Sequence, residues 1–93
     1  MPQLKQRPEL AARIRLKFDR LSGKWLLLSP EHGLELSPTA HAIVELCDGT
    51  RELSEIARAL GQRFSCDSVA EIERDLVAFT QALEGRALLR FHG

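Results

Sequence analysis

The sequence predicts an α+β domain in which a three-stranded antiparallel sheet is followed by a three-helix bundle, in a winged-helix-like arrangement. Two apolar patterns predict it: strand-like runs occupy residues 13–36, and apolar residues at helical spacing follow from residue 38 to residue 85. The chain has 93 residues, of which 44% are hydrophobic. That length holds one domain with a modest core.

Three segments read as strands. Residues 13–19 place Ile14, Leu16 and Phe18 between charged residues, which is typical of a strand with one solvated face. After a turn at residues 21–23, the continuous run KWLLLS at 24–29 predicts a strand that is buried on both faces. The segment formed by Leu34, Glu35 and Leu36 is long enough for one further short strand.

Three helices follow. Ser37 is a good N-cap, and Pro38 suits the first turn because its missing N–H is not needed there. Asp48-Gly49 is expected to end this helix. The second helix is expected over residues 53–64, and the third between a capping box at Ser68 and Gly85. The residues expected on the inner faces are Ala40, Ile43, Val44 and Cys47, then Leu53, Ile56, Ala57, Leu60 and Phe64, then Val69, Ile72, Leu76, Phe79 and Leu83.

The two ends of the chain complete the expected organisation. Residues 1–10 contain Pro2 and Pro8 and predict an extended arm, and residues 11–93 predict the domain itself. A short closing strand is expected at residues 87–91. The chain shows neither an apolar signal core nor a run long enough to cross a bilayer, so we expect it in the cytoplasm. A disulfide is not expected there, and Cys47 reads as a small core residue.

Charge is separated along the chain. The formal net charge is zero, yet residues 1–25 carry seven basic and two acidic residues, and the rest carries six basic and eleven acidic ones. The third helix has Asp67, Glu71, Glu73, Asp75 and Glu84 against Arg74 alone. Such a helix would be repelled by the phosphates that flank a major groove. The pattern therefore disfavours nucleic acid, although a DNA-binding winged-helix regulator remains the alternative reading.

Patterns that encode catalysis are missing from the sequence. His32, His41 and His92 are scattered, and no spacing typical of a metal site or a phosphate-binding loop occurs. We therefore expect no metal, no cofactor and no enzymatic activity.

A peptide groove is the remaining possibility. The strand at 34–36 can leave an edge with unpaired N–H and C=O groups, which accepts an added strand. Val69, Ile72 and Leu76 on the third helix can supply apolar pockets opposite it, with Glu73 or Arg74 making polar contacts at the rim. The alternative is that Val69, Ile72 and Leu76 are simply core residues.

Six ordered segments carry a resemblance that covers nearly the whole chain. They are RPEL at 7–10, RLKFD at 15–19, KWLLLSPE at 24–31, LELSPTA at 34–40, IVELCDG at 43–49 and SEIARAL at 54–60. In these segments the chain resembles the PqqD family, the peptide chaperones of pyrroloquinoline quinone (PQQ) biosynthesis. It departs from the family at Glu52, where Ser or Thr often opens the second helix, and at Ala87, where Gly is common.

The resemblance implies a non-catalytic adaptor. Family members bind the ribosomally made precursor peptide PqqA and present it to the radical S-adenosylmethionine enzyme PqqE, which holds the cofactors. The same fold recognises leader peptides in other modification pathways, a further alternative. Carried onto this chain, the peptide site falls at Leu34, Glu35 and Leu36, with Val69, Ile72, Glu73 and Leu76 opposite.

Contacts to the partner enzyme are expected elsewhere. Arg13, Arg15 and Lys17 share the polar side of the first predicted strand and suit an acidic surface. Trp25 is either a core anchor or a partner contact. A homodimer, including one that exchanges strands, is compatible with the separated charges and the arm.

Overall fold

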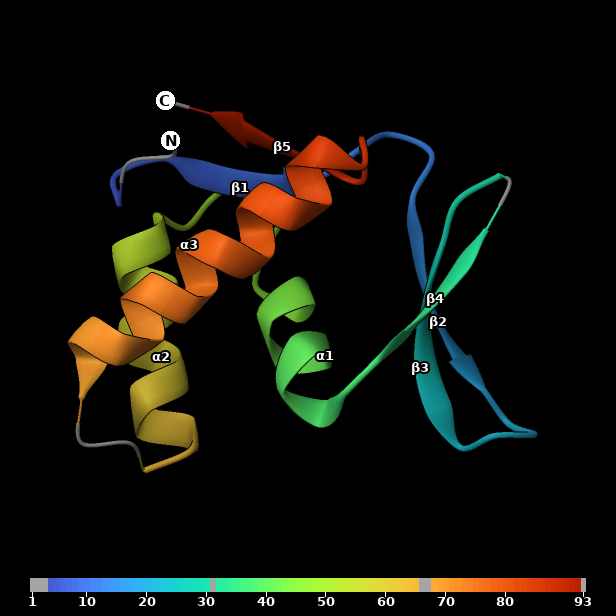
Figure 1. The fold of residues 1–93 in the computed structure, drawn as a ribbon, viewed down its shortest axis with the longest axis horizontal. Coiled ribbons are helices and arrows are strands. Elements are labelled where there is room, and N and C mark those ends of the chain that lie inside the picture. The colour runs from blue at the N-terminus through green and yellow to red at the C-terminus, as the bar shows by residue number, and fades with distance from the viewer. Residues whose placement is uncertain (1–3, 31, 66–67, 93) are drawn as a thin grey trace.

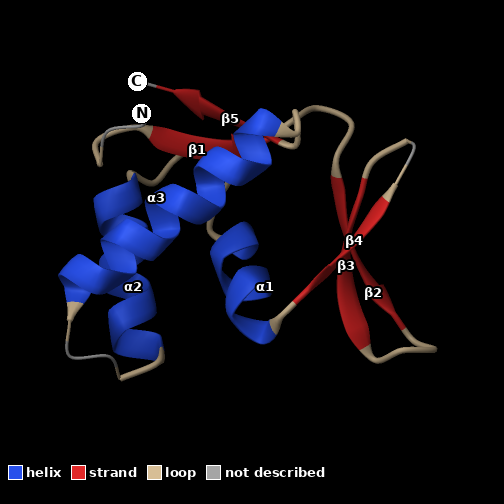
Figure 2. Ribbon diagram, in the orientation of Figure 1, coloured by secondary structure: helices blue, strands red, loops and turns tan. Residues whose placement is uncertain are grey.

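The computed structural model describes residues 4–30, 32–65 and 68–92. It confirms the α+β architecture, with the helices on one side of a three-stranded sheet and a second, two-stranded sheet above them in the view (Figures 1 and 2). One sheet has the order β2-β3-β4 and the other pairs β1 with β5. The elements are β1 Arg7–Leu10, β2 Arg15–Asp19, β3 Lys24–Leu28, β4 Gly33–Leu36, α1 Pro38–Glu45, α2 Leu53–Arg63, α3 Val69–Gly85 and β5 Leu89–His92.

The three-stranded sheet has one apolar and one polar face. In antiparallel pairing, residues directly opposite one another share a face. Trp25 pairs with Phe18 and Leu36, and Leu27 pairs with Leu16 and Leu34. We call the face that these residues share the inner face; it joins the core cluster through Leu27, which is 1% exposed, and Leu36. The outer face carries Arg15, Lys17, Asp19, Lys24, Leu26, Leu28, Gly33 and Glu35.

The expectation that β3 is buried on both faces is wrong. Leu27 is buried, but Leu26 and Leu28 on the outer face are only half-buried. The reason is that the helices lie on one side of this sheet (Figure 1). Among the described residues, no second layer of helix or strand lies against the outer face, so Leu26 and Leu28 are not part of a core there.

The helices match the predicted segments, with differences at their ends. α1 begins at Pro38 after the Ser37 cap but ends at Glu45, before the expected Asp48-Gly49. Its buried side chains include Ile43 and Val44, and α2 and α3 add Leu53, Ile56, Leu60, Leu76 and Leu83. Phe64 and Val69, expected on inner faces, are 46% and 38% exposed. Phe64 follows the last residue of α2 and Val69 is the first residue of α3, so both lie at helix ends, beyond the buried core.

The N-terminal segment is part of the fold. β1 pairs antiparallel with β5, and the Glu9 carboxylate contacts Nε2 of His92 at 2.7 Å across the two strands. On its other side, β1 borders the connection between α1 and α2: the Gly49 N–H donates to the carbonyl of Pro8. The expected arm at residues 1–10 therefore contains a strand that lies between two distant parts of the chain.

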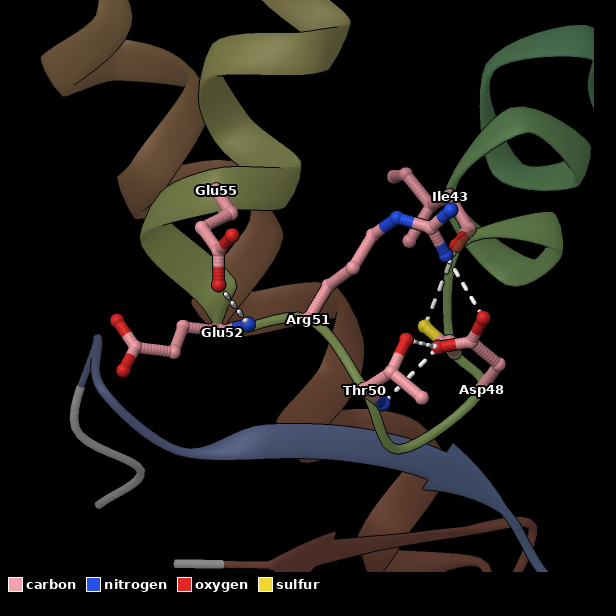
Figure 3. A network of polar contacts seen from close by, with 7 residues as sticks. Ile43, Asp48, Thr50, Arg51, Glu52 and Glu55 are labelled. Atoms are coloured by element: carbon pink, nitrogen blue, oxygen red, sulfur yellow. Dashed lines mark hydrogen bonds and ion pairs between the residues drawn. The ribbon is translucent and has the colours of Figure 1, made fainter.

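The same segment completes the start of α2. The Leu53 and Ser54 N–H groups donate to the carbonyls of Gln6 and Leu4, both at 3.0 Å. The first N–H groups of a helix have no partner inside the helix and need one from elsewhere. Glu52, which the sequence marks as a weak cap, is helped by Glu55, whose carboxylate accepts from the Glu52 N–H at 3.0 Å (Figure 3).

The connection before α2 is held by polar contacts. The Asp48 carboxylate accepts from the Thr50 hydroxyl at 2.6 Å and pairs with Arg51 at 2.8 Å (Figure 3). The hydrogen bonds from Thr50 are the main cause that lowers the pKa of Asp48 below its usual value. In the part of the chain that the structure describes, no helix is long and apolar enough to span a membrane.

Candidate peptide-binding site

The free edge of β4 is the first component of the candidate site. Among the described residues, β4 pairs with β3 on one side and with no strand on the other. The Ser29 N–H donates to the His32 carbonyl at 2.9 Å, which makes 29 and 32 a hydrogen-bonded pair. Because antiparallel pairs alternate, Leu34 and Leu36 direct their backbone groups toward β3, and Gly33 and Glu35 direct theirs outward. These outward groups form a short template for an added strand.

The second component is a pocket of about 540 Å³ at the end of the inner face. Three separate segments line it: residues 11–14 before β2, residues 86–88 after α3, and the β3–β4 hairpin through Leu27, Ser29, Pro30, His32, Gly33 and Leu34. We call it the hairpin pocket. Its walls are mostly apolar, and the described lining residues with a formal charge are Arg13 and Arg86. Glu31, in the same hairpin, lies outside the described residues.

Edge and pocket adjoin each other. Gly33 and the next residue, Leu34, both line the pocket; Gly33 also turns its backbone to the free edge, while Leu34 turns its side chain to the inner face. By contrast, none of residues 15–19 of β2, the other edge strand, lines the pocket. A chain that adds to β4 therefore runs beside the part of the pocket that Gly33 and Leu34 line.

The structure does not bring the predicted residues of α3 beside this edge. Figure 1 shows the N-terminal half of α3 over α2, on the side of α1 away from the three-stranded sheet. Leu76 is 1% exposed and belongs to the core, while Ile72 and Glu73 are half-buried. The end of α3 that borders the pocket is its C-terminus, near residues 86–88. Contact between a peptide and Val69, Ile72, Glu73 or Leu76 stays a prediction.

The predicted partner contacts fall in three places. Arg15 and Lys17 lie exposed on the outer face of β2, whereas Arg13 precedes the strand and lines the hairpin pocket. Trp25 is half-buried on the inner face, and its ring stacks on His41 with centroids 4.2 Å apart. This stacking supports the reading of Trp25 as an anchor between the sheet and α1.

Other chemistries find little support in the part of the chain that the structure describes. No group of three His, Cys, Asp or Glu side chains converges to hold a metal ion there. Cys47 is buried and donates to the Ile43 carbonyl, and burial raises the pKa of its thiol to about 12, so it is a poor nucleophile. Cys66 lies outside the described residues. On α3, Glu71, Asp75 and Glu84 are exposed, which leaves the DNA-binding alternative without a basic recognition helix.

Sequence reasoning found the edge strand but missed the pocket. Residues 11–14 and 86–88 read as the connections to the predicted strands at 13–19 and 87–91 and as the first residues of those strands, and nothing local in them indicates that they meet. One signal was present in the sequence: Ala87 stands where Gly is common in the family that the chain resembles, and the structure gives this residue a left-handed conformation with φ at 61°.

Comparisons with known proteins agree with this architecture. A family described as "Coenzyme PQQ synthesis protein D (PqqD)" matches residues 24–89. Proteins named "PqqA binding protein" from Xanthomonas oryzae pv. oryzae (strain PXO99A) and Xanthomonas axonopodis pv. citri are 41% and 42% identical, over 89% and 90% of each chain.

Two solved structures are also similar. The solution NMR structure of the PqqD truncation of Methylobacterium extorquens PqqCD, described as a functional and stand-alone RiPP recognition element, superposes with a TM-score of 0.76 at 36% identity, covering 89% of this chain and 87% of that one. The crystal structure of PqqD from Xanthomonas campestris gives a TM-score of 0.60 at 40% identity, covering 87% and 89%.

Proposed function

The chain belongs to the PqqD family, and from this premise we propose that it is a non-catalytic adaptor in PQQ biosynthesis that binds the precursor peptide PqqA. The observation that carries the proposal is the outward backbone of Gly33 and Glu35 beside the hairpin pocket. Relatives named as PqqA binding proteins, which match most of this chain, support the choice of peptide.

The mechanism is strand addition. PqqA extends along β4, where its backbone exchanges hydrogen bonds with Gly33 and Glu35, and alternate side chains turn toward the pocket or toward solvent. Backbone bonds supply affinity that is independent of sequence, and the side chain in the pocket sets the register. Leu36 contributes as a buried anchor that holds β4 against the core rather than as a contact.

An amide titration with PqqA tests the proposal, and the other edge of the sheet serves as its control. On β4, the backbone N–H and C=O groups of Gly33 and Glu35 point away from β3. By the same alternation, those of Leu16 and Phe18 point away from β3 at the free edge of β2. We expect the largest amide shifts at Gly33 and Glu35, with Leu16 and Phe18 little changed. Shifts confined to β2, or an absence of saturable shifts, would contradict the proposed site.

We further propose that the adaptor presents the bound peptide to PqqE through the outer face of the sheet. Arg15 and Lys17 are exposed there, and they suit an acidic surface on the enzyme. This face points away from the hairpin pocket, so both partners can bind at once. Replacing both residues by Glu should weaken PqqE binding at low salt and leave PqqA affinity unchanged. Equal loss of both affinities would place the two partners on one surface.

A further inference from the structure

Ala87 holds a strained conformation in the wall of the hairpin pocket. α3 ends in a Schellman motif: the Leu88 N–H donates to the Leu83 carbonyl and the Ala87 N–H to the Glu84 carbonyl, both at 2.9 Å. The motif requires a left-handed residue at position 87, where φ is 61°. Glycine adopts this conformation without a steric penalty, whereas the Cβ of alanine approaches the following carbonyl oxygen.

Strain of this kind persists where it serves a purpose or where the surroundings impose it. The hydrogen bonds of the turn do not require a side chain at residue 87, and glycine would form them equally well. Ala87 itself is exposed and lines the pocket together with Leu34 and Leu88. The methyl group is thus the one part of this residue that the turn does not require.

The charges around the pocket indicate the chemistry of its occupant. The described lining combines alanine, isoleucine, leucine and proline with two basic residues, Arg13 and Arg86, and with the polar residues Ser29 and His32, and it includes no acidic residue. An apolar surface with two cations beside it suits an apolar side chain that has a carboxylate close by in the same segment.

We propose that the hairpin pocket selects a segment of PqqA in which an apolar side chain lies next to an acidic residue, with the Ala87 methyl as the wall that sets the depth of the pocket. Arg13 and Arg86 receive the carboxylate at the mouth. This inference rests on the proposed function, since it names the part of the peptide that the β4 site recognises.

The Ala87→Gly variant separates this role from a purely structural one. Relief of strain should raise the melting temperature by about 4 °C, while the loss of one apolar methyl contact should weaken PqqA binding about fourfold in calorimetric titration. Ser65→Gly is the matched control, because Ser65 also has a positive φ, of 52°, and does not line the pocket. It should gain stability without a change in affinity.

The charge component has its own matched pair. Arg86→Gln should weaken PqqA binding about fivefold at low salt and reduce its salt dependence, whereas Arg90→Gln, exposed on β5 and outside the pocket, should not. Replacing the acidic residues of PqqA one at a time by their amides should identify one position at which Arg86→Gln causes no further loss of affinity.

If the wild-type chain binds PqqA and the Ala87→Gly and Arg86→Gln variants bind it with the same affinity as the wild type, the inference is wrong and the proposed function stands. If the wild-type chain does not bind PqqA, the proposed function fails first.

Discussion

The indole ring of Trp25 lies on the imidazole ring of His41, with centroids 4.2 Å apart and planes inclined by 11°. Phe18 meets the same indole edge-on at 5.3 Å. Trp25 belongs to β3, Phe18 to β2 and His41 to α1, so the cluster joins two strands to the first helix. It therefore holds the sheet that carries the β4 edge against the helical part of the domain.

His41→Ala should loosen this joint. Removal of one member of an aromatic pair costs about 1 kcal/mol of unfolding free energy, which denaturant titration will measure. Since the chain has one tryptophan and no tyrosine, its fluorescence reports Trp25 alone, and the emission should shift to the red. His41→Phe keeps a ring in place but loses the contact with Glu45, so it should restore the emission. An unchanged spectrum in His41→Ala would mean that the stacking does not shield Trp25.

Glu35→Pro should weaken PqqA binding without unfolding the sheet. Proline removes the outward N–H of residue 35, which β4 does not use for pairing with β3. The loss of one hydrogen bond corresponds to a fall in affinity of about threefold to tenfold, measured by calorimetry.

Glu35→Ala is the control for that prediction, since it keeps the N–H and removes only the side chain that pairs with Lys24 at 3.3 Å. Exposed pairs of this kind contribute little, so its affinity and stability should be close to those of the wild type. Equal losses in both variants would assign the effect to the carboxylate and not to the backbone.

Deletion of residues 1–6 should destabilise the start of α2. It removes the carbonyls of Leu4 and Gln6 that accept from the Ser54 and Leu53 N–H groups. The loss of helix capping of this kind costs about 1–2 kcal/mol. Hydrogen exchange should accelerate most at the amides of Leu53 and Ser54, and a deletion of residues 1–3 should leave both amides protected. Unchanged exchange after the longer deletion would show that water replaces the carbonyls without loss.

The thiol of Cys47 should make stability depend on pH in the alkaline range. Burial raises its pKa from 9.0 to about 12, so the folded state keeps the proton that the unfolded state releases. The stabilisation is complete below pH 9 and is lost as the pH rises from 9 toward 12. At pH 10 the loss is about 1.4 kcal/mol relative to pH 8. Cys47→Ala should lack this part of the slope, and parallel curves for the two proteins would contradict it.

The sequence determined β2, β3, β4 and the three helices because their signals are local, whereas β1 read as an arm because it becomes a strand only by pairing with β5. Ser37 and Ser68 cap α1 and α3 through their own neighbours, with the Ser37 hydroxyl accepting from Ala40 and that of Ser68 from Glu71. The alternation in β2 and the helical spacing in α2 arise within one element and need no distant partner to be visible. These signals also predicted β4 as a short strand whose edge can accept a peptide.

Tertiary structure decided what depends on distant segments meeting. The leucine run of β3 has the same sequence whether a second layer covers it or not, and only the placement of all helices on one side left Leu26 and Leu28 half-buried. Likewise, Val69 and Ile72 have the spacing of a groove wall, but the N-terminal half of α3 crosses α2 on the side away from the three-stranded sheet (Figure 1). The hairpin pocket exists because residues 11–14 and 86–88 close around Leu34, a contact across most of the chain. No local pattern encodes it, since it follows from the packing of β1 on β5 and of the sheet on α1.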